Sequence, residues 1–344
     1  MGWSDTVVCV NFQYLYFQSV SASMQAPDVL PGESPRTLLV LGSGGTIAGL
    51  APRAGDTLGY QAAQVGVAQL LAGFDAPPGC VLQVEQVAQI DSKDMDAAVW
   101  LQLAQRCAEA LARDDVQGIV ITHGTDTLEE TAYFLQAVLA PAKPVVLACA
   151  MRPANAAMPD GPQNLRDALA VAAQPGAHGV VAVCAGVVHA AFDVRKVHGY
   201  RLDAFGSGDA GPLGYVEAGA LRQLRDWPQT VPTAGLLARL PAVPQAWPRV
   251  EIVFSHAGAS GAGVDALVRD GARGIVVAAT GNGSVHRALE AALLRAQAAG
   301  VRVLRASRCE QGRVMGGEGD ALPGAGALSP VKARIQLQLD LLGA

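Results

Sequence analysis

The stretch Thr37-Leu-Leu-Val-Leu-Gly-Ser-Gly-Gly-Thr-Ile-Ala-Gly49 is an apolar run that passes into a loop almost free of side chains. A short apolar run followed by glycines is typical of a buried parallel strand that leads towards a helix. Such loops often bind phosphate, but a Walker loop needs a Gly-Lys-Ser/Thr sequence, and a dinucleotide loop needs a third glycine where Ile47 stands. Two interpretations remain: the loop is a plain turn, or Thr46 is a nucleophile whose attack creates an oxyanion that backbone N–H groups stabilise.

Beyond this stretch, short apolar runs alternate with amphipathic helical patterns. The predicted strands are 37–41, 81–87, 118–122, 144–148 and 179–185, and the predicted helices are 63–74, 95–111, 128–138 and 161–173. Continuous apolar strands that alternate with helices indicate a parallel sheet covered on both faces. We therefore expect an α/β fold with a larger N-terminal parallel-sheet domain, flavodoxin-like in kind, and a smaller C-terminal α/β domain.

A cluster of prolines between residues 226 and 248 interrupts this alternation and is typical of an interdomain linker. The alternation then resumes with strands at 250–254, 274–280 and 301–305 and helices at 264–270 and 285–298. The last helix is predicted to begin after the N-cap Ser329 with Pro330 and to end near Leu342. The expected organisation is an N-terminal catalytic domain at 37–225, a linker at 226–248 and a C-terminal domain at 249–344.

Residues 1–36 differ from the rest of the chain and are predicted to be a tag or a disordered leader. Leu15-Tyr-Phe-Gln-Ser19 resembles the scar of a tag-removing protease, and Met24 is then the natural start. The alternative is a weak signal peptide that ends near Val20-Ser-Ala-Ser23, but this segment has neither a basic start nor a clean apolar core.

Composition narrows the class of function. The formal net charge of -5 provides no basic surface for nucleic acid. No apolar run reaches the ~18 residues that span a bilayer. The 6 cysteines show neither CxxC nor zinc spacing, so no metal or other cofactor is expected. A reducing compartment, the cytoplasm, suits such cysteines better than a disulfide framework, although the periplasm is an alternative.

Polar loops follow three of the predicted strands, where ligands bind in open α/β sheets. They contain Thr46, the segment Asp91-Ser-Lys-Asp94 and the segment Thr122-His-Gly-Thr-Asp-Thr127. The last segment would also serve as a plain helix N-cap, because threonine and aspartate are good caps. Two threonine loops in one sheet favour chemistry instead, and each hydroxyl then needs a base, for which a buried lysine is suitable.

Two long motifs, Gly44-Gly-Thr-Ile-Ala-Gly49 and the segment 119–135, together resemble the bacterial-type L-asparaginase and glutaminase-asparaginase family. The likeness covers nearly all of the chain from residue 37 onwards. It continues in order through Ala150-Met-Arg-Pro153, Asp160-Gly-Pro-Gln-Asn-Leu165, Asp193-Val-Arg-Lys196, Gly211-Pro-Leu-Gly-Tyr215, Gly281-Asn-Gly-Ser284 and Ser329-Pro-Val-Lys-Ala-Arg334.

The resemblance implies two groups of catalytic residues. Thr46 matches the family's nucleophile, and Tyr60 matches the tyrosine on a mobile lid that helps to activate it. Thr125, Asp126 and Lys196 match a second catalytic set of threonine, aspartate and lysine.

The resemblance also implies how the substrate is held. Ser92 and Asp126 match the residues that bind the α-carboxylate and the α-amino group, and Ala150 lies in the segment that contacts the side-chain amide. Gly45, Lys93 and Ser284 complete the expected substrate-binding set.

The implied reaction converts L-asparagine to L-aspartate and ammonia, with L-glutamine as a possible second substrate. The implied assembly is a homotetramer built from intimate dimers, in which Ser284 reaches the active site of a neighbouring subunit.

Three positions depart from the family pattern. Lys93 stands where relatives usually carry an uncharged residue or glutamate, so it either alters the grip on the substrate or points to solvent. Ser284 stands where many asparaginases carry asparagine, which favours glutamine as a co-substrate. The acidic partner of Thr46 and Tyr60 is uncertain, and Glu318 is the candidate by spacing.

Two other functions fit the same motifs. An amidotransferase subunit that acts on a tRNA-bound substrate would carry an extra N-terminal domain, for which residues 1–36 are too short. A non-catalytic amino-acid sensor would not need two hydroxyls of nucleophilic type. Ammonia release from free asparagine separates these three functions.

Overall fold

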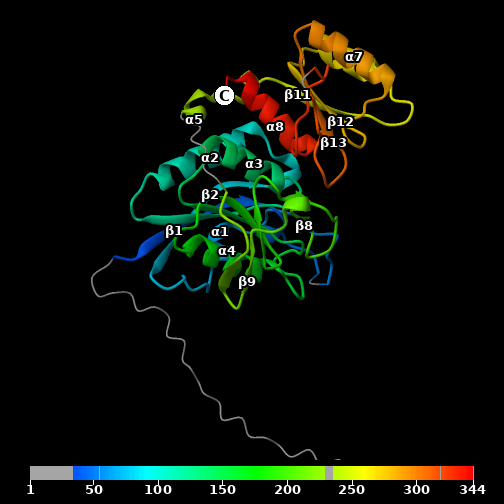
Figure 1. Ribbon diagram of the computed structural model, residues 1–344. Coiled ribbons are helices and arrows are strands. Elements are labelled where there is room, and N and C mark those ends of the chain that lie inside the picture. Colours follow the sequence, from blue (N-terminus) through cyan, green and yellow to red (C-terminus); the bar gives the residue numbers. More distant parts are fainter. Residues whose placement is uncertain (1–33, 54, 229–234, 318, 344) are drawn as a thin grey trace, which may run out of the picture. The chain divides into compact units, whose positions relative to one another are not determined.

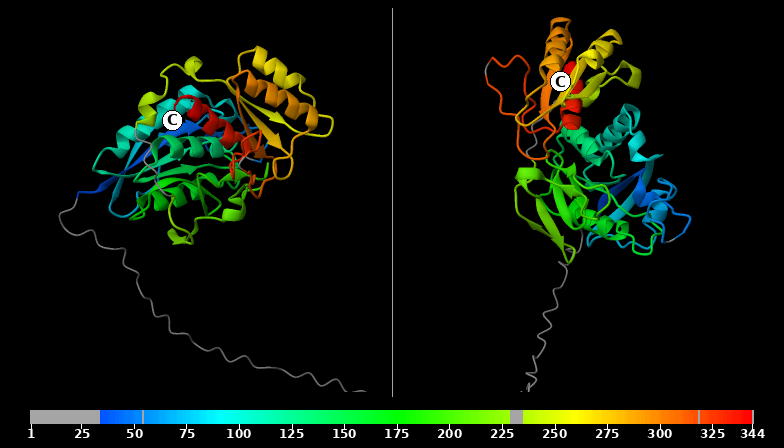
Figure 2. Two further views of the ribbon diagram at one scale, coloured as in Figure 1. Left: turned by 45° about the horizontal axis from the view of Figure 1, so that its top comes forward. Right: turned by 90° about the vertical axis from the view of Figure 1, so that its right-hand side faces the viewer.

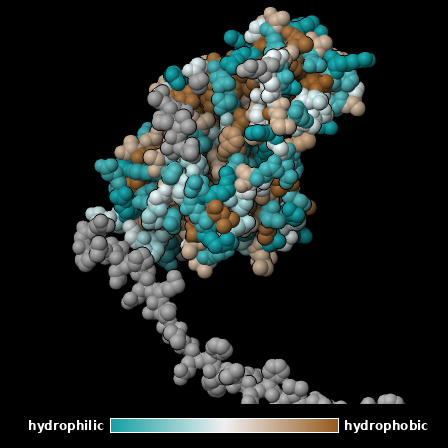
Figure 3. Space-filling view, in the orientation of Figure 1, coloured by the Kyte–Doolittle hydropathy of each residue, from teal (hydrophilic) through white to brown (hydrophobic). Residues whose placement is uncertain are grey.

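The computed structural model describes residues 34–53, 55–228, 235–317 and 319–343. The prediction for the leader therefore falls almost entirely outside the described residues, and so does Glu318. No helix in the described ranges is long and apolar enough to cross a membrane. On the face seen in Figure 3, hydrophobic residues are scattered among hydrophilic ones instead of forming one continuous band.

The larger sheet has 8 strands in the order β10-β9-β6-β5-β4-β3-β1-β2 among the described residues (Figure 1). Its parallel part has the flavodoxin-like order β2-β1-β3-β4-β5 that the sequence predicts. The bounds are β1 Arg36–Gly44, β2 Cys80–Ile90, β3 Val116–Thr122, β4 Pro144–Ala148 and β5 Gly179–Cys184. The inner strands are almost wholly buried, which explains their continuous apolar sequences.

The remaining strands of this sheet are antiparallel, so the predicted parallel sheet is extended at one edge into a mixed sheet. They are β6 Val187–Ala190, β9 Gly214–Glu217 and β10 Ala220–Gln223. Tight turns connect β5 to β6 and β9 to β10, with Ala185 and Ala218 at positive φ and a glycine after each. These strands are short and half polar, which is why their sequences carry little strand signal.

Helices cover both faces of the large sheet (Figure 1). One core contains the apolar faces of α2 Ala97–Leu111 and α3 Leu128–Leu139, and the other contains that of α4 Gly161–Ala173. The predicted helix 63–74 is much shorter than expected, since α1 spans only Val67–Leu70. Residues 63–65 instead donate backbone hydrogen bonds to Gly45 and Ala48 in the first glycine loop, and Ala63 has a φ of 57° that no helix accepts.

The smaller sheet is parallel, in the order β11-β12-β13. Its strands are β11 Val250–Phe254, β12 Gly274–Ala279 and β13 Arg302–Ser307, with α6 Ala262–Arg269 and α7 Arg287–Ala298 packed on one face. The last helix, α8 Pro330–Leu341, begins after the N-cap Ser329 as predicted. It packs on the other face of the small sheet and also against α3 of the larger layer, so it joins the two cores (Figure 2).

Short elements complete the described chain. The two-stranded ribbon of β7 Arg195–Lys196 and β8 Phe205–Gly206 lies outside both larger sheets. Within the proline-rich segment, α5 Leu236–Arg239 and the 3-10 turn Pro244–Ala246 are described, and the side chains of Leu236, Leu240 and Trp247 enter the core beside α3.

Candidate active site

The glycine loop after β1 brings two backbones into direct contact. Gly44 and Gly45 have φ angles of 101° and 80°, which side chains disfavour. A Cβ on Gly45 would lie 2.3 Å from the Cα of Gly124, in the loop after β3. The two polar loops therefore lie in contact at the same edge of the sheet, as expected for loops that follow neighbouring parallel strands. The N–H of Gly45 donates to the Ile90 carbonyl at 2.9 Å and is not free for a ligand.

Thr46 opens the 3-10 turn Thr46–Ala48 and is 7% exposed. Its Oγ1 lies 2.8 Å from the hydroxyl oxygen of Tyr60. The chain returns to this point because Leu50 and Gln61 exchange two backbone hydrogen bonds of 2.9 Å. A tyrosine hydroxyl at this distance can accept the threonine proton or return one to it.

Lys196 joins the second group of predicted residues. Its Nζ donates to Thr125 Oγ1 at 2.8 Å and to Asp126 Oδ1 at 2.6 Å. The lysine side chain is only 18% exposed, whereas the Asp126 side chain is 53% exposed. The ammonium is thus held between a buried hydroxyl and a carboxylate that still faces solvent. This arrangement polarises the Thr125 hydroxyl and leaves Asp126 accessible to a cationic group of a ligand.

Ser92 connects the loop after β2 to the same group. Its Oγ accepts the Asp126 N–H at 3.2 Å, and its carbonyl accepts the Thr127 hydroxyl at 2.7 Å. Ala150 follows β4 and is fully buried in a small cluster with Ile47 and Val65. The structure therefore brings Ser92 to the Thr125–Asp126 loop and Ala150 to the Thr46 loop.

Two predicted residues lie apart from this group. The Lys93 Nζ forms ion pairs with Asp91 at 3.0 Å and Asp94 at 2.9 Å, and the lysine side chain is 61% exposed. The hydrogen bonds to Asp94 and Asp91 raise the pKa of Lys93. Ser284 lies in the exposed turn after β12, where its backbone pairs with Thr280, and among the described residues no hydrogen bond joins it to the Thr46 loop of the same chain.

Two side chains that support the site were missed in the sequence. Glu129 Oε1 accepts the backbone N–H of Lys196 at 3.2 Å. The only sequence signal for this contact is the position of Glu129 just after the Thr-Asp-Thr segment. Glutamate is common in the first turn of a helix, so this position alone does not reveal the contact. Lys332 is fully buried on α8, and burial lowers the pKa of its ammonium to about 7. Lysine is mostly exposed in proteins, so its place in a predicted helix gives no sign that Lys332 is buried.

His123 lies beside the site as a neutral side chain. It is fully buried, its Nδ1 lies 2.7 Å from the Gly124 carbonyl, and burial lowers the pKa of the imidazole to about 4. The Nδ1 hydrogen bond requires a proton on that nitrogen, so His123 acts as a donor that braces the loop after β3.

Known proteins are similar to this chain over most of its length. Residues 37–229 match the family model "Asparaginase, N-terminal", and residues 249–343 match "Glutaminase/Asparaginase C-terminal domain". The chain is 38% identical over 299 residues to a glutaminase-asparaginase of Pseudomonas fluorescens biotype A, covering 84% of this chain and 80% of that protein. It is 37% identical over 314 residues to L-asparaginase 2 of Escherichia coli (strain K12), covering 88% of each.

A solved structure is similar as well. The crystal structure of a "Probable Cytoplasmic L-asparaginase" from Campylobacter jejuni superposes with a TM-score of 0.80 at 35% identity, covering 90% of this chain and 96% of that one. Matches of this extent, together with the motifs gathered at the strand ends, show that the chain belongs to the asparaginase/glutaminase family and is an amidohydrolase of the L-asparaginase type.

Proposed function

We propose that this enzyme hydrolyses L-asparagine to L-aspartate and ammonia, with Thr46 as the nucleophile. The observation that carries the proposal is the 2.8 Å contact of Thr46 Oγ1 with the Tyr60 hydroxyl, at the sheet edge that also holds the Lys196–Thr125–Asp126 group. Thr46 is the better candidate of the two threonines because its hydroxyl is paired with the Tyr60 hydroxyl, which can relay its proton. The Thr125 hydroxyl is already hydrogen-bonded to an ammonium, which makes it less nucleophilic.

The proposed reaction has two steps, formation of an acyl-threonine and its hydrolysis. The Thr46 oxygen attacks the side-chain amide carbon of asparagine, the Tyr60 hydroxyl takes the threonine proton while it gives its own proton to the amide nitrogen, and that nitrogen leaves as ammonia. Water then attacks the acyl-threonine, L-aspartate is released and the threonine hydroxyl is restored. Lys196, held between Thr125 and Asp126, gives a proton to the departing threonine oxygen and takes one from the attacking water.

Substrate orientation follows from the charges around this group. The exposed carboxylate of Asp126 faces the α-ammonium, and the buried Ser92 hydroxyl still has a proton to donate to the α-carboxylate. The Lys93 ammonium is engaged by Asp91 and Asp94, so it contributes little to the anchoring of the substrate. L-Glutamine is a second substrate in this proposal, because one methylene changes the transition-state energy by only ~1–3 kcal/mol.

We also propose that the active site is completed in a homotetramer built from intimate dimers. Ser284 does not contact the Thr46 loop of its own chain, yet it lies on an exposed turn near exposed Met315, whose backbone is hydrogen-bonded to Asn282. In this proposal the turn that carries Ser284 therefore meets the active site of a neighbouring subunit. A mass measurement in solution tests this, and a fully active monomer would contradict it.

A cytoplasmic location is part of the same proposal. Cys80, Cys107, Cys149, Cys184 and Cys309 are all free thiols in the described chain. Free thiols persist in a reducing compartment. Cell fractionation that places the protein in the periplasm would overturn this location.

The experiment that tests the function combines turnover with detection of the intermediate. The parent enzyme is expected to release ammonia from asparagine, and Thr46→Ala to lose well over ~10²-fold in kcat while it stays folded. In rapidly quenched parent enzyme, peptide mass spectrometry should find asparagine minus ammonia attached to the peptide that contains Thr46. An adduct on the Thr125 peptide would reverse the two roles, and binding without ammonia release would indicate a sensor.

A further inference from the structure

The β7 strand that carries Lys196 has little support of its own. It is only two residues long and pairs with β8 alone, through Arg195 with Gly206 and Lys196 with Phe205. An isolated two-stranded ribbon is marginally stable in water. The Lys196 ammonium nevertheless has to stay within 2.8 Å of Thr125 Oγ1 and 2.6 Å of Asp126 Oδ1. Other contacts must therefore fix this ribbon.

One of these contacts comes from α8 of the C-terminal domain. The fully buried Lys332 Nζ donates to the carbonyls of Ala191 at 3.0 Å, Phe192 at 2.8 Å and Val194 at 2.5 Å. These carbonyls belong to the segment that runs from the end of β6 into β7. A buried ammonium is tolerated only when its donors are satisfied, so three convergent carbonyls hold this segment in one conformation.

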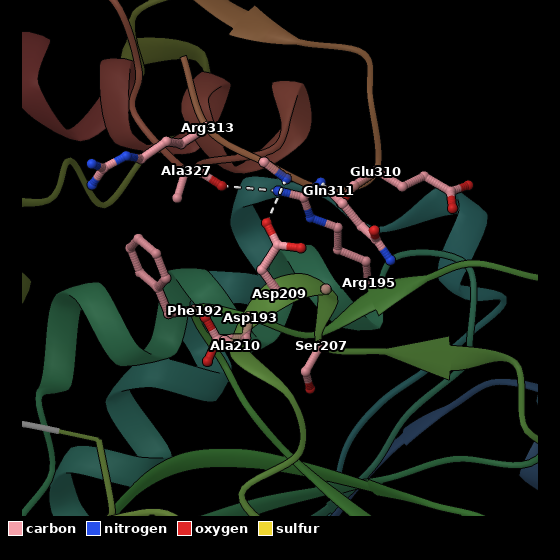
Figure 4. Close-up of a pocket in the computed structure, with 12 residues that line it drawn as sticks. Phe192, Asp193, Arg195, Ser207, Asp209, Ala210, Glu310, Gln311, Arg313 and Ala327 are labelled. Atoms are coloured by element: carbon pink, nitrogen blue, oxygen red, sulfur yellow. Dashed lines mark hydrogen bonds between the residues drawn. The ribbon is translucent and has the colours of Figure 1, made fainter. Parts of the chain in front are cut away.

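The second contact runs in the opposite direction. Arg195 projects from β7 into the C-terminal domain, where its Nη1 donates to the Glu310 carbonyl at 2.6 Å and its Nη2 to the Ala327 carbonyl at 2.9 Å (Figure 4). These groups surround a cavity of about 280 Å³ whose wall also contains Asp193 and Arg313. A planar guanidinium that binds two separate carbonyls fixes both distance and direction.

We propose that Lys332 and Arg195 are positioning residues through which the C-terminal domain sets the place of Lys196, an inference that rests on the proposed role of Lys196 in proton transfer. Lys332 immobilises the residues just before β7, and Arg195 ties β7 itself. Glu129, which accepts the Lys196 N–H, holds the same strand from the side of α3. Neither cation touches Thr125 or Asp126, so both act on the reaction only through the lysine that they place.

The test compares Lys332→Met and Arg195→Met with a control on the same helix. Gln338 is also buried on α8 and donates to a backbone carbonyl, that of Pro248 at 2.9 Å, far along the chain from β7. Gln338→Met therefore removes a similar buried polar contact without releasing β7. For each variant, kcat and KM for ammonia release from asparagine are measured together with the urea midpoint of unfolding.

Lys332→Met is expected to lower kcat by at least ~10-fold with KM changed by less than ~3-fold, because a misplacement near 1 Å can cost as much as ~10²-fold. Arg195→Met, whose side chain is at the surface, should give a smaller loss of the same type. Gln338→Met should lose stability and keep kcat within ~2-fold. In a Lys196→Met background, Arg195→Met should lower the residual kcat no further, since the lysine through which it acts is already absent.

Several outcomes would overturn this inference. They are an Arg195→Met enzyme with the parent kcat, a Lys332→Met enzyme that behaves like Gln338→Met, or an equal loss with and without Lys196. If Lys332→Met does not fold, Arg195→Met and its Lys196→Met cycle decide the question. A parent that releases no ammonia overturns the proposed function and this inference with it, whereas an active parent with unaffected variants overturns this inference alone.

Discussion

Gly45→Ala is expected to damage both the stability of the protein and the Thr46 site. The backbone of Gly45 has φ 80° and ψ -173°, a region almost restricted to glycine that costs an L-residue about 1–3 kcal/mol. A Cβ at this position would also lie 2.3 Å from Gly124 Cα and N, whereas carbon atoms at rest are ~3.5–4.0 Å apart. Backbone on both sides must shift to relieve this overlap, and overpacking of this kind costs about 1–3 kcal/mol. The sum is a loss of about 2–6 kcal/mol in the free energy of unfolding.

Gly73→Ala is the control for a positive φ without a steric contact. Gly73 has a φ of 79°, and a Cβ there meets no heavy atom within 4 Å. Its variant should therefore lose only the about 1–2 kcal/mol of backbone strain and keep parent activity. Urea unfolding at one protein concentration measures both variants, and the rate of ammonia release from asparagine measures the site. Equal losses of stability in the two variants, or full activity in Gly45→Ala, would show that the contact between the two loops does not shape the site.

Three further predictions address the chemistry. Lys196→Met keeps the apolar stem and removes both hydrogen bonds, to Thr125 and to Asp126. It should reduce kcat by more than ~10²-fold with little change in melting temperature. Turnover equal to that of the parent would show that Lys196 is only a surface charge. Ser284→Asn should lower the glutamine-to-asparagine ratio of kcat/KM. Lys93→Gln should leave this ratio unchanged, because the Lys93 ammonium is held by two aspartates. A ratio that changes only in Lys93→Gln would show that Ser284 does not determine specificity. Burial lowers the pKa of His123 to about 4 from its ordinary value of 6.5. The unfolded chain therefore binds more protons in this range, and the free energy of unfolding should fall as the pH drops from 6.5 to 4. The fall in urea midpoint over this range should be smaller in His123→Gln, and an unchanged slope would show that the imidazole does not stay neutral in the folded protein.

Much of the fold follows from local sequence. The apolar runs of β1, β3, β4 and β5 need cover on both faces, and the helices between them supply it, so their parallel order could be predicted without coordinates. The segment 63–74 shows the limit of such patterns. Its apolar spacing suits a helix, but the backbone N–H groups of residues 63–65 donate to the carbonyls of Gly45 and Ala48. These tertiary hydrogen bonds outweigh a helix propensity of a few tenths of a kcal/mol per residue.

The amino-acid sequence specifies the chemistry available at each strand end: a threonine after β1, a serine after β2, and a threonine with an aspartate after β3. Which of these groups meet depends on the packing of the whole chain. Lys196 reaches Thr125 across 71 residues of chain, and Lys332 reaches the Val194 carbonyl across 138. Local periodicity reports on neighbours three or four residues apart, whereas these contacts exist only after both cores have packed and α8 has docked between them. The buried Lys332 is therefore the feature least visible in the sequence, since lysine side chains are almost always exposed unless the fold covers them.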